Sequence, residues 1–377
     1  MLGKAGLVEI LIEKLKNFFP PTSIDPCLQV DCKLSLLESR TQKQDCDLDA
    51  IDSATCALAN VLSLHTPNTI RLLAVGGLEV IFKIFHSHSY FLVDLLDFDK
   101  EIRIRGNAAN VLTNVLAAMR EEGCLQNGHF GKRLRDNETN KQLQSLAPAL
   151  ISLCAASLQS ARRAAALLLG NLALESELRV ALGEGGAIEA LWSAYVQASD
   201  KDQCNITLWA LSNLVWSSRA NQERCGPFLE SAVSAAYKSA HTFRQPQKWT
   251  KSAVKHNNIV LERAWTLCLV ANALYFNEPN RARLICSCDS IEKLVVLAGP
   301  YEPPIVREPA LRCLISITST YRGVRRVVLS DYNSGACKTF VRAISENAYG
   351  AEGVRLQQLG AAALANICTS TDARKAV

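Results

Sequence analysis

The sequence has few aromatic residues and little excess of either charge. Phenylalanine, tryptophan and tyrosine make up 6% of its 377 residues, whereas hydrophobic residues together make up 49%. A core with so few rings has to be built mainly from leucine, alanine, isoleucine and valine, as in closely packed helices. The formal net charge of +5 is small for this length, so charge gives no reason to expect nucleic acid or a membrane surface as a partner.

Long apolar runs and a secretory signal are also missing. No stretch of 18 apolar residues is without a charge, and we therefore expect no transmembrane helix. Glu9, Glu13 and Lys14 interrupt the apolar N-terminal stretch, which is unlike a signal peptide. Many of the 14 cysteines fall inside predicted helices, where a buried thiol behaves as a small apolar residue. This usage predicts reduced thiols and a cytoplasmic or nuclear location.

Motifs for metal binding and catalysis are absent as well. Cys286-x-Cys288 and Cys27-x4-Cys32 each lack a second pair at zinc-finger spacing, and structural zinc needs four converging ligands. None of the six histidines lies in a recognisable nucleophile or metal motif. We therefore expect no enzymatic activity, no metal and no cofactor.

One helix with an asparagine on it recurs along the chain. Residues 206–216 are predicted to form about three turns of helix, with an apolar face and, on another face, Trp209 and Asn213 four residues apart. Asparagine, or once serine, recurs at the register of Asn213, each time before an apolar residue: Asn60, Asn114, Asn171, Asn213, Asn272, Ser316 and Asn366. The 42 residues from Asn171 to Asn213 are the period of a helical solenoid.

A second element recurs between these helices, in residues 2–11, 74–81 and 183–191. Its glycines let the chain turn through positive φ, so that one short helix ends and the next begins. With Gly-Gly-Ala-Ile at 185–188 and Leu-Trp-Ala-Leu-Ser-Asn-Leu at 208–214, the sequence resembles the armadillo repeat family over almost its whole length. The resemblance implies an all-α, right-handed superhelical solenoid of about seven repeats, with incomplete terminal repeats.

We expect a single solenoid over residues 1–377 with three insertions. They lie at about 18–47, 121–142 and 241–255, where proline, glycine or mixed polar residues interrupt the apolar pattern. In and just after the first insertion, the polar run from Ser39 to Asp49 is predicted to be a loop. The third is basic, which is compatible with contact to nucleic acid or to an acidic partner, but a solvated insertion is the preferred interpretation.

The asparagine row can be explained by peptide binding. An asparagine amide carries both a donor and an acceptor, so it can hold the backbone of an extended chain, which advances about 3.3 Å per residue. Trp209 offers a flat face for an aliphatic stem or a cation. The predicted peptide groove comprises Asn60, Asn114, Asn171, Glu175, Trp209, Asn213, Asn272, Ser316 and Asn366. Alternatively, the asparagines bond to adjacent repeats and stabilise the solenoid. The other tryptophans considered, Trp192, Trp216 and Trp265, are expected to pack internally.

Within the armadillo family, the pairing of Trp209 with Asn213 is typical of importin-α, the nuclear-import adaptors that hold nuclear localisation signals. Only this copy has both residues. Those adaptors also tend to place an acid four residues after the asparagine to meet a ligand lysine, and here only Glu175 fits. A positively charged chain is in addition a poor electrostatic match for basic ligands.

The sequence therefore predicts a non-catalytic scaffold that binds an extended peptide or a partner protein in the asparagine-lined groove. An importin-α-like adaptor for basic nuclear localisation signals is the first alternative. A cytoskeletal, ciliary or signalling scaffold with a folded or acidic partner is the second. Nucleic acid is not an expected partner.

Overall fold

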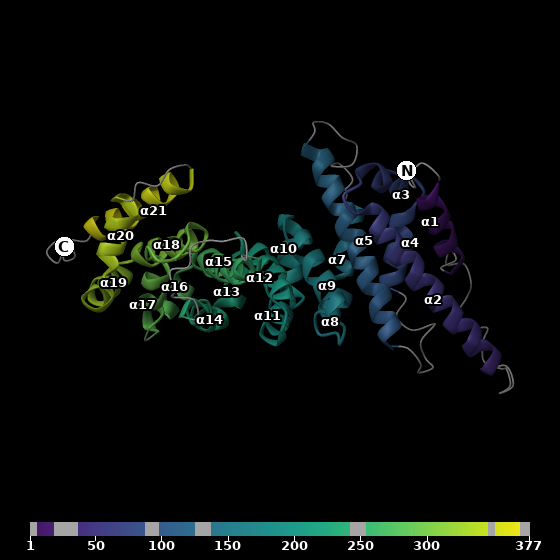
Figure 1. The fold of residues 1–377 in the computed structure, drawn as a ribbon, viewed down its shortest axis with the longest axis horizontal. Coiled ribbons are helices and arrows are strands. Elements are labelled where there is room, and N and C mark those ends of the chain that lie inside the picture. Colours follow the sequence, from purple (N-terminus) through teal and green to yellow (C-terminus); the bar gives the residue numbers. More distant parts are fainter. Residues whose placement is uncertain are drawn as a thin grey trace. The chain divides into compact units, whose positions relative to one another are not determined.

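The structure is a computed structural model that describes residues 6–18, 37–86, 98–124, 137–241, 254–287, 289–345 and 351–369. These residues form helices joined by short turns, and no strand occurs among them (Figure 1). The predicted all-α solenoid is confirmed. The chain divides into two compact units, residues 1–178 and 179–377, and each unit is described by itself.

The first unit contains the helices up to α9. They are α1 (Leu7–Phe18), α2 (Leu37–Leu62), α3 (Thr66–Ala74), α4 (Gly77–His86), α5 (Phe98–Cys124), α7 (Asn137–Ser145), α8 (Ala147–Cys154) and α9 (Gln159–Leu172). Helices α2, α5 and α9 carry the predicted asparagines, and α5 packs between the other two.

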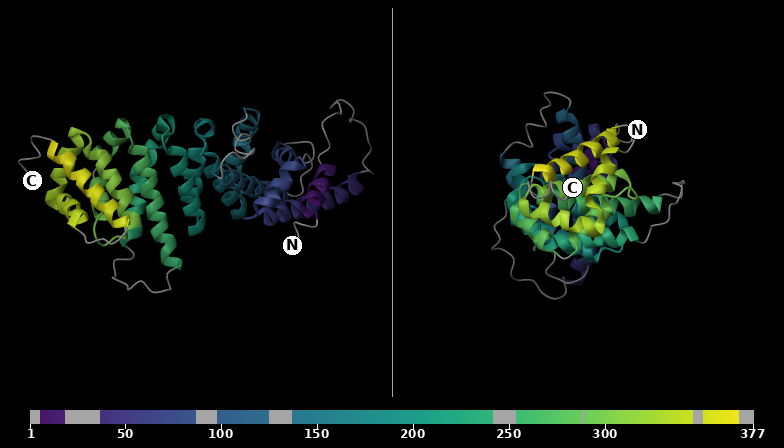
Figure 2. Two further views of the ribbon diagram at one scale, coloured as in Figure 1. Left: turned by 90° about the horizontal axis from the view of Figure 1, so that it is seen from above. Right: turned by 90° about the vertical axis from the view of Figure 1, so that its left-hand side faces the viewer.

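The second unit repeats a triplet of helices, and the first of these helices, α10, begins three residues before Arg179. The triplets are α10 (Ser176–Glu184), α11 (Ala187–Gln197) and α12 (Lys201–Val215); α13 (Arg219–Cys225), α14 (Leu229–His241) and α15 (Val254–Leu274); α16 (Glu278–Cys286), α17 (Ser290–Leu297) and α18 (Pro304–Thr318); and α19 (Tyr321–Ser334), α20 (Ala336–Ser345) and α21 (Ala351–Thr369). Figure 2 shows them following one another in chain order, from teal through green to yellow.

Two groups of helices are named from this arrangement. The first helices are α13, α16 and α19, and each packs on the next. The third helices are α12, α15, α18 and α21 in the second unit and α2, α5 and α9 in the first. Within each unit, consecutive third helices pack side by side.

Local sequence explains where these helices begin. Gly76 immediately precedes α4 and has a φ of 72°, and Gly186 immediately precedes α11 and has a φ of 94°. Both are positive, as the glycine pairs predict. The Asp200 side chain caps α12 by accepting a hydrogen bond from Gln203 N at 2.9 Å. Asn277 caps α16 in the same way through Asn280 N at 3.0 Å. Such caps satisfy amides that a helix N-terminus leaves unpaired.

The apolar faces of the third helices form part of the core, together with buried residues of the other helices. Ala210, Leu211, Leu214 and Val215 on α12 are completely buried, as the helical spacing predicts, while Ile206 is only half-buried. Full burial of a leucine or valine side chain contributes about 1.5–3 kcal/mol. None of the helices that the structure describes is both long and apolar enough to cross a membrane.

The predicted loop from Ser39 to Asp49 is wrong, because α2 begins at Leu37 and continues through this run. The segment is polar but contains no glycine or proline, and its Glu, Gln, Lys and Arg residues have good helix propensity. Residues 19–36, 125–136 and 242–253, which make up most of the three predicted insertions, lie outside the described residues.

Candidate binding surface

In the second unit, Trp209 and Asn213 lie four residues apart on α12, and both are half-buried. The structure thus places them on a partly accessible face of a third helix. Ser316 on α18 is also half-buried. Whether these positions contact a ligand stays a prediction.

Asn272 on α15 is only 6% exposed, and its amide is used inside the protein. Its Nδ2 donates to the backbone oxygen and to Oγ of Ser212 on α12, at 3.0 and 2.9 Å. Its Oδ1 accepts from Nη2 of Arg312 on α18 at 3.4 Å. One asparagine therefore connects three consecutive third helices.

Asn366 on α21 also bonds to the preceding third helix. Its Nδ2 donates to the Ile315 oxygen and to Thr318 Oγ1 on α18, at 3.2 Å in each case. In the first unit, Asn114 Nδ2 donates to the Ala59 oxygen on α2 at 2.9 Å. At these positions the amides form the contacts expected if the asparagines stabilise the solenoid. Asn60 differs because it is exposed.

The predicted pair of Asn171 and Glu175 is occupied by a cation of the chain itself. Arg120, at the C-terminal part of α5, donates through Nη1 to Asn171 Oδ1 at 2.8 Å and through Nη2 to the Asn171 backbone oxygen. Its Nη2 also lies 3.8 Å from Glu175 Oε1. Burial lowers the pKa of the Arg120 guanidinium, and the Glu175 carboxylate partly opposes this shift. Arg120 thus takes the place that a basic ligand side chain would need.

A cavity of about 320 Å³, lined mainly by residues of polar type, opens on the third helices of the first unit. Within it, Asp52 accepts from Asn107 Nδ2 at 2.9 Å and from Arg103 Nε at 3.2 Å. Cys56 and Asn110 lie four residues before Asn60 and Asn114, at the register that Trp209 holds on α12. The lining residues are Asp52, Ser53, Cys56, Arg103, Gly106, Asn107, Asn110 and Ser160.

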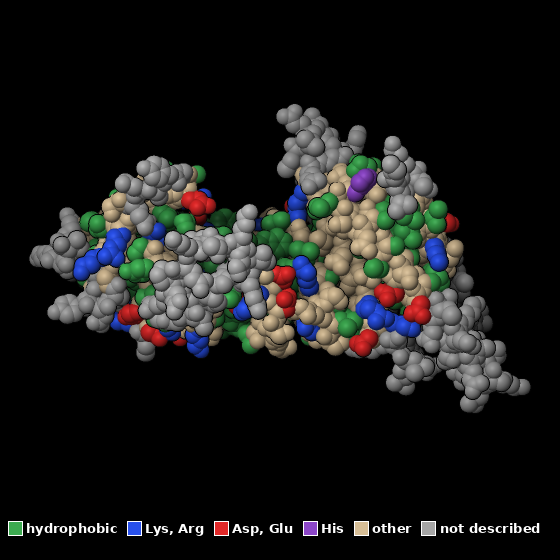
Figure 3. Space-filling view, viewed as in Figure 1, with side chains coloured by type: hydrophobic (Ala, Val, Ile, Leu, Met, Phe, Trp, Pro, Cys, Tyr) green, Lys and Arg blue, Asp and Glu red, His purple; other side chains and the backbone are tan. Residues whose placement is uncertain are grey.

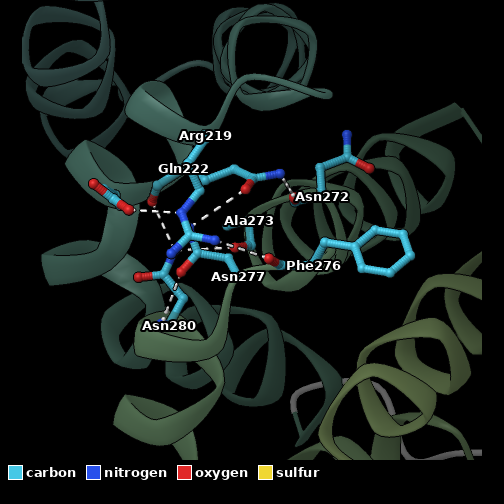
Figure 4. Close-up of polar contacts among 8 residues, drawn as sticks. Arg219, Gln222, Asn272, Ala273, Phe276, Asn277 and Asn280 are labelled. Atoms are coloured by element: carbon cyan, nitrogen blue, oxygen red, sulfur yellow. Dashed lines mark hydrogen bonds and ion pairs between the residues drawn. The ribbon is translucent and has the colours of Figure 1, made fainter. Parts of the chain in front are cut away.

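A second row of asparagines, which the sequence analysis missed, lies at the starts of α3, α13 and α16. Asn68, Asn221 and Asn280 are 4%, 0% and 2% exposed. Asn221 Nδ2 donates to the oxygens of Leu214 and Arg179, both at 2.8 Å. Asn280 Nδ2 donates to the oxygens of Ala273 and Gln222, at 3.0 and 2.7 Å (Figure 4). Asn221 and Asn280 therefore each join a first helix to two helices of the preceding triplet, α12 and α10 for Asn221 and α15 and α13 for Asn280.

A signal for this row is present in the sequence. Asn68, Asn221 and Asn280 each follow a third-helix asparagine by eight residues. Glycines in the preceding repeat leave space for two of them. A Cβ on Gly183, in α10, would lie 1.8 Å from Asn221 Oδ1, and one on Gly226, the C-cap of α13, would lie 2.5 Å from Asn280 Oδ1. The glycines and the second asparagines thus fit together.

The tryptophans divide between the interior and the surface. Trp192 packs against Phe228 and Tyr195, with ring centroids 5.1 and 5.3 Å apart, as expected, and Trp265 is half-buried. The expectation that Trp216 packs internally is wrong, because this residue is 44% exposed. It follows the last residue of α12 and is the C-cap of that helix. Its side chain therefore no longer follows the buried helical face of α12.

Within the described residues, no group of three or more His, Cys, Asp and Glu side chains is arranged to hold a metal ion. The buried thiols are also poor nucleophiles, because burial raises the pKa of Cys154 and Cys225 to about 12 and only a thiolate reacts readily. Cys27, Cys32 and Cys288 of the two cysteine pairs lie outside the described residues.

Comparison with known proteins identifies structures of similar fold, but no protein-family model and no curated protein matches the chain. A crystal structure of an engineered protein is 18% identical, over 98% of this chain and 70% of its own, with a TM-score of 0.62. At this identity the likeness concerns the fold alone.

Two designed armadillo repeat proteins are also similar, with lower TM-scores. One is 13% identical over 95% of this chain and 99% of its own, with a TM-score of 0.42. The other, in complex with the peptide (KR)4, is 16% identical over 68% of this chain and 93% of its own, with a TM-score of 0.46. The helix triplets of the second unit have the three-helix composition of armadillo repeats. The chain has an armadillo-like repeat fold.

Proposed function

We propose that the chain is a non-catalytic scaffold that binds an extended segment of a partner protein along its third helices. The observation that carries this proposal is the cavity on α2, α5 and α9. A solenoid presents a long surface on which consecutive repeats address consecutive parts of a ligand. A cavity on that surface gives one ligand side chain a specific place.

The chemistry of the cavity selects a polar, uncharged side chain. Asp52 and Arg103 form an ion pair at 3.2 Å, so neither charge calls for a ligand charge of opposite sign. The hydroxyls of Ser53 and Ser160 and the amide of Asn110 remain as hydrogen-bonding groups around the cavity. Serine, threonine, asparagine and glutamine side chains fit this set, and the exposed Asn60 amide lies one turn further along α2.

Filling the cavity tests the proposal. The variant Asn110→Trp places on α5 the residue that α12 carries at the same register, so the helix has a precedent for it. Binding is measured on an array of synthetic peptides in three sets: neutral polar, acidic and basic. The unchanged chain should bind the neutral polar set. The variant should bind them at least about tenfold more weakly, a loss of about 1.4 kcal/mol.

The matched control is Glu79→Trp, at an exposed position of α4 that does not line the cavity. It should bind peptides as the unchanged chain does. If Asn110→Trp binds equally well, or no peptide of any set binds, the third-helix surface is not a peptide site.

The importin-α-like alternative predicts binding of the basic set, and it is tested at Arg120. Removing this side chain with Arg120→Ala leaves Asn171 Oδ1 and the Glu175 carboxylate without their cation. If the alternative holds, this variant should gain affinity for Lys/Arg-rich peptides, and salt should weaken the binding. If Arg120→Ala binds basic peptides no better than the unchanged chain does, the importin-α-like alternative is wrong. A cytoplasmic or nuclear location, which a fluorescent fusion would reveal, is part of either proposal.

A further inference from the structure

The second unit exposes three aromatic side chains in mutual contact. Trp216, Tyr275 and Phe276 are 44%, 46% and 74% exposed. The rings of Trp216 and Tyr275 stack at 6.1 Å with 12° between their planes, and Phe276 meets Tyr275 edge-on at 4.5 Å. Trp216 and Tyr275 hold the same register, three residues after Asn213 and Asn272. Contiguous exposed rings of this kind mark interaction surfaces.

The polar network beneath this cluster holds Phe276 outward. The residue has a φ of 48°, a conformation that costs a residue with a side chain about 1–2 kcal/mol. Arg219 fixes it by donating from Nη1 to the Phe276 oxygen at 3.0 Å, while its Nε pairs with Glu223 at 2.6 Å. Figure 4 shows the ring turned away from the contacts around Gln222 and Asn277. The backbone at Phe276 is therefore held, and its ring is 74% exposed with the edge contact to Tyr275.

The first helices, of which α13 and α16 directly follow these rings, carry a clear excess of positive charge. Helices α13, α16 and α19 contain seven arginines, no lysine and three acidic residues. Their sum, seven minus three, is +4, against +5 for the whole chain. The small overall charge thus conceals a strongly basic edge.

Four of these arginines are exposed and form no ion pair with a described residue: Arg224, Arg283, Arg322 and Arg325. Arg224 and Arg283 hold the same register, three residues after Asn221 and Asn280. The Arg325 guanidinium lies 5.9 Å from the centre of the Tyr321 ring, which is 55% exposed. Figure 3 shows a group of basic side chains over α19 and α20 at one end of this unit.

From these observations we propose that the basic–aromatic edge, made of Trp216, Tyr275, Phe276 and the four exposed arginines, docks an acidic segment of a partner protein that carries apolar anchor residues. Arginine forms two parallel hydrogen bonds to a carboxylate, and the rings supply rigid apolar area at low entropic cost. This surface is distinct from the cavity on the third helices of the first unit, and it does not depend on the function proposed for that cavity.

An acidic protein segment fits this edge better than nucleic acid does. The Trp216 and Tyr275 rings each cover one face of the other by stacking, whereas single-stranded nucleic acid needs free ring faces on which its bases can stack. RNA is therefore a competitor in the test.

The test measures binding of a fluorescent peptide of alternating glutamate and leucine to the full chain. A lysine–leucine peptide and single-stranded polyuridine serve as competitors. The variant Phe276→Gly removes the ring and places glycine where φ is positive, so it should not harm the fold. The variant Arg224→Glu/Arg283→Glu reverses two charges. Each should weaken binding of the acidic peptide at least about tenfold.

The matched control is Lys14→Glu/Lys141→Glu, which makes the same change of charge at exposed positions of α1 and α7 in the first unit. It should bind the acidic peptide within about threefold of the unchanged chain, as expected for cations outside the site. Equal weakening by this control would reduce the effect to net charge and overturn the proposal. So would tighter binding of polyuridine than of the acidic peptide, or no binding of the peptide. The variant Asn110→Trp should leave this binding unchanged, which separates the two proposals.

Discussion

Two rows of asparagines in the second unit use the same side chain differently. On the first helices, Asn221 and Asn280 are almost completely buried, and each amide nitrogen donates to two backbone oxygens. On the third helices, Asn272 is buried in the same manner, but Asn213 is half-buried beside a half-buried Trp209. Asparagines at the same register of the third helices therefore differ in how deeply they are buried.

The largest effect should come from removing an amide of the first-helix row. Asn280→Ala leaves the oxygens of Ala273 and Gln222 without this donor in a buried place. We expect a loss of about 2–4 kcal/mol in the free energy of unfolding, measured by urea denaturation followed by circular dichroism. A loss no larger than that of Asn213→Ala would remove the difference between the rows.

Replacing a glycine that packs against Asn221 also tests the first-helix asparagines. In Gly183→Ala the new methyl group would lie 1.8 Å from Asn221 Oδ1, and the amide cannot move without losing its two hydrogen bonds. We expect a destabilisation of about 2–3 kcal/mol. In the double variant Gly183→Ala/Asn221→Ala the clash is gone, so the two losses should be less than additive. Strict additivity would show that the two residues do not interact.

The burial of the first-helix asparagines and their neighbours from solvent can be tested through the pH dependence of stability. Cys225, one turn after Asn221, is 1% exposed, and burial raises the pKa of its thiol from 9.0 to about 12. Above pH 9 the unfolded chain loses this proton and the folded chain keeps it, so stability should fall as pH rises towards 12. The slope contributed by this thiol is at most about 1.4 kcal/mol per pH unit.

The variant Cys225→Ala should flatten the alkaline fall in the free energy of unfolding relative to the unchanged chain. Alkylation followed by mass spectrometry gives an independent readout, because Cys286 is exposed and Cys225 is buried. Iodoacetamide should modify Cys286 in the folded chain and Cys225 only after unfolding. Equal rates at the two thiols would contradict the buried environment.

The smallest effect on stability is expected on the third helices. The double variant Trp209→Ala/Asn213→Ala removes half-buried side chains and should cost at most about 1–2 kcal/mol, with helical circular dichroism retained. If these residues contact the ligand, peptide binding should fall by at least about tenfold. Binding that stays unchanged would restrict both residues to a structural role.

Sequence patterns predicted the features that depend on neighbours along the chain. The helical period, the glycine turns at Gly76 and Gly186 and the buried face of α12 were all predictable, because each depends on residues within a few positions. Partners of the amides were not predictable in this way. Asn114 bonds to an oxygen 55 residues earlier, and Asn272 to one 60 residues earlier. Whether an amide meets a ligand or a carbonyl depends on helix spacing, which no local pattern specifies.

The errors also have local physical causes. The run from Ser39 to Asp49 was interpreted as a loop from its polarity, although polarity without glycine or proline is compatible with a helix. The basic–aromatic edge was missed because the net charge was taken over the whole chain. Counting charge separately for each short helix would have revealed it.

The amides of Asn221 and Asn280 each cross a boundary between repeats, and this has a consequence for how the second unit unfolds. In a linear array, cooperativity depends on the free energy of the interfaces relative to that of each repeat. Hydrogen bonds across successive boundaries raise this coupling, so α10–α18 should melt together as a single transition. The variant Asn280→Ala removes the hydrogen bonds that Asn280 forms across one boundary and should split the single unfolding transition into two. Hydrogen exchange should then show α16–α18 opening separately from α13–α15.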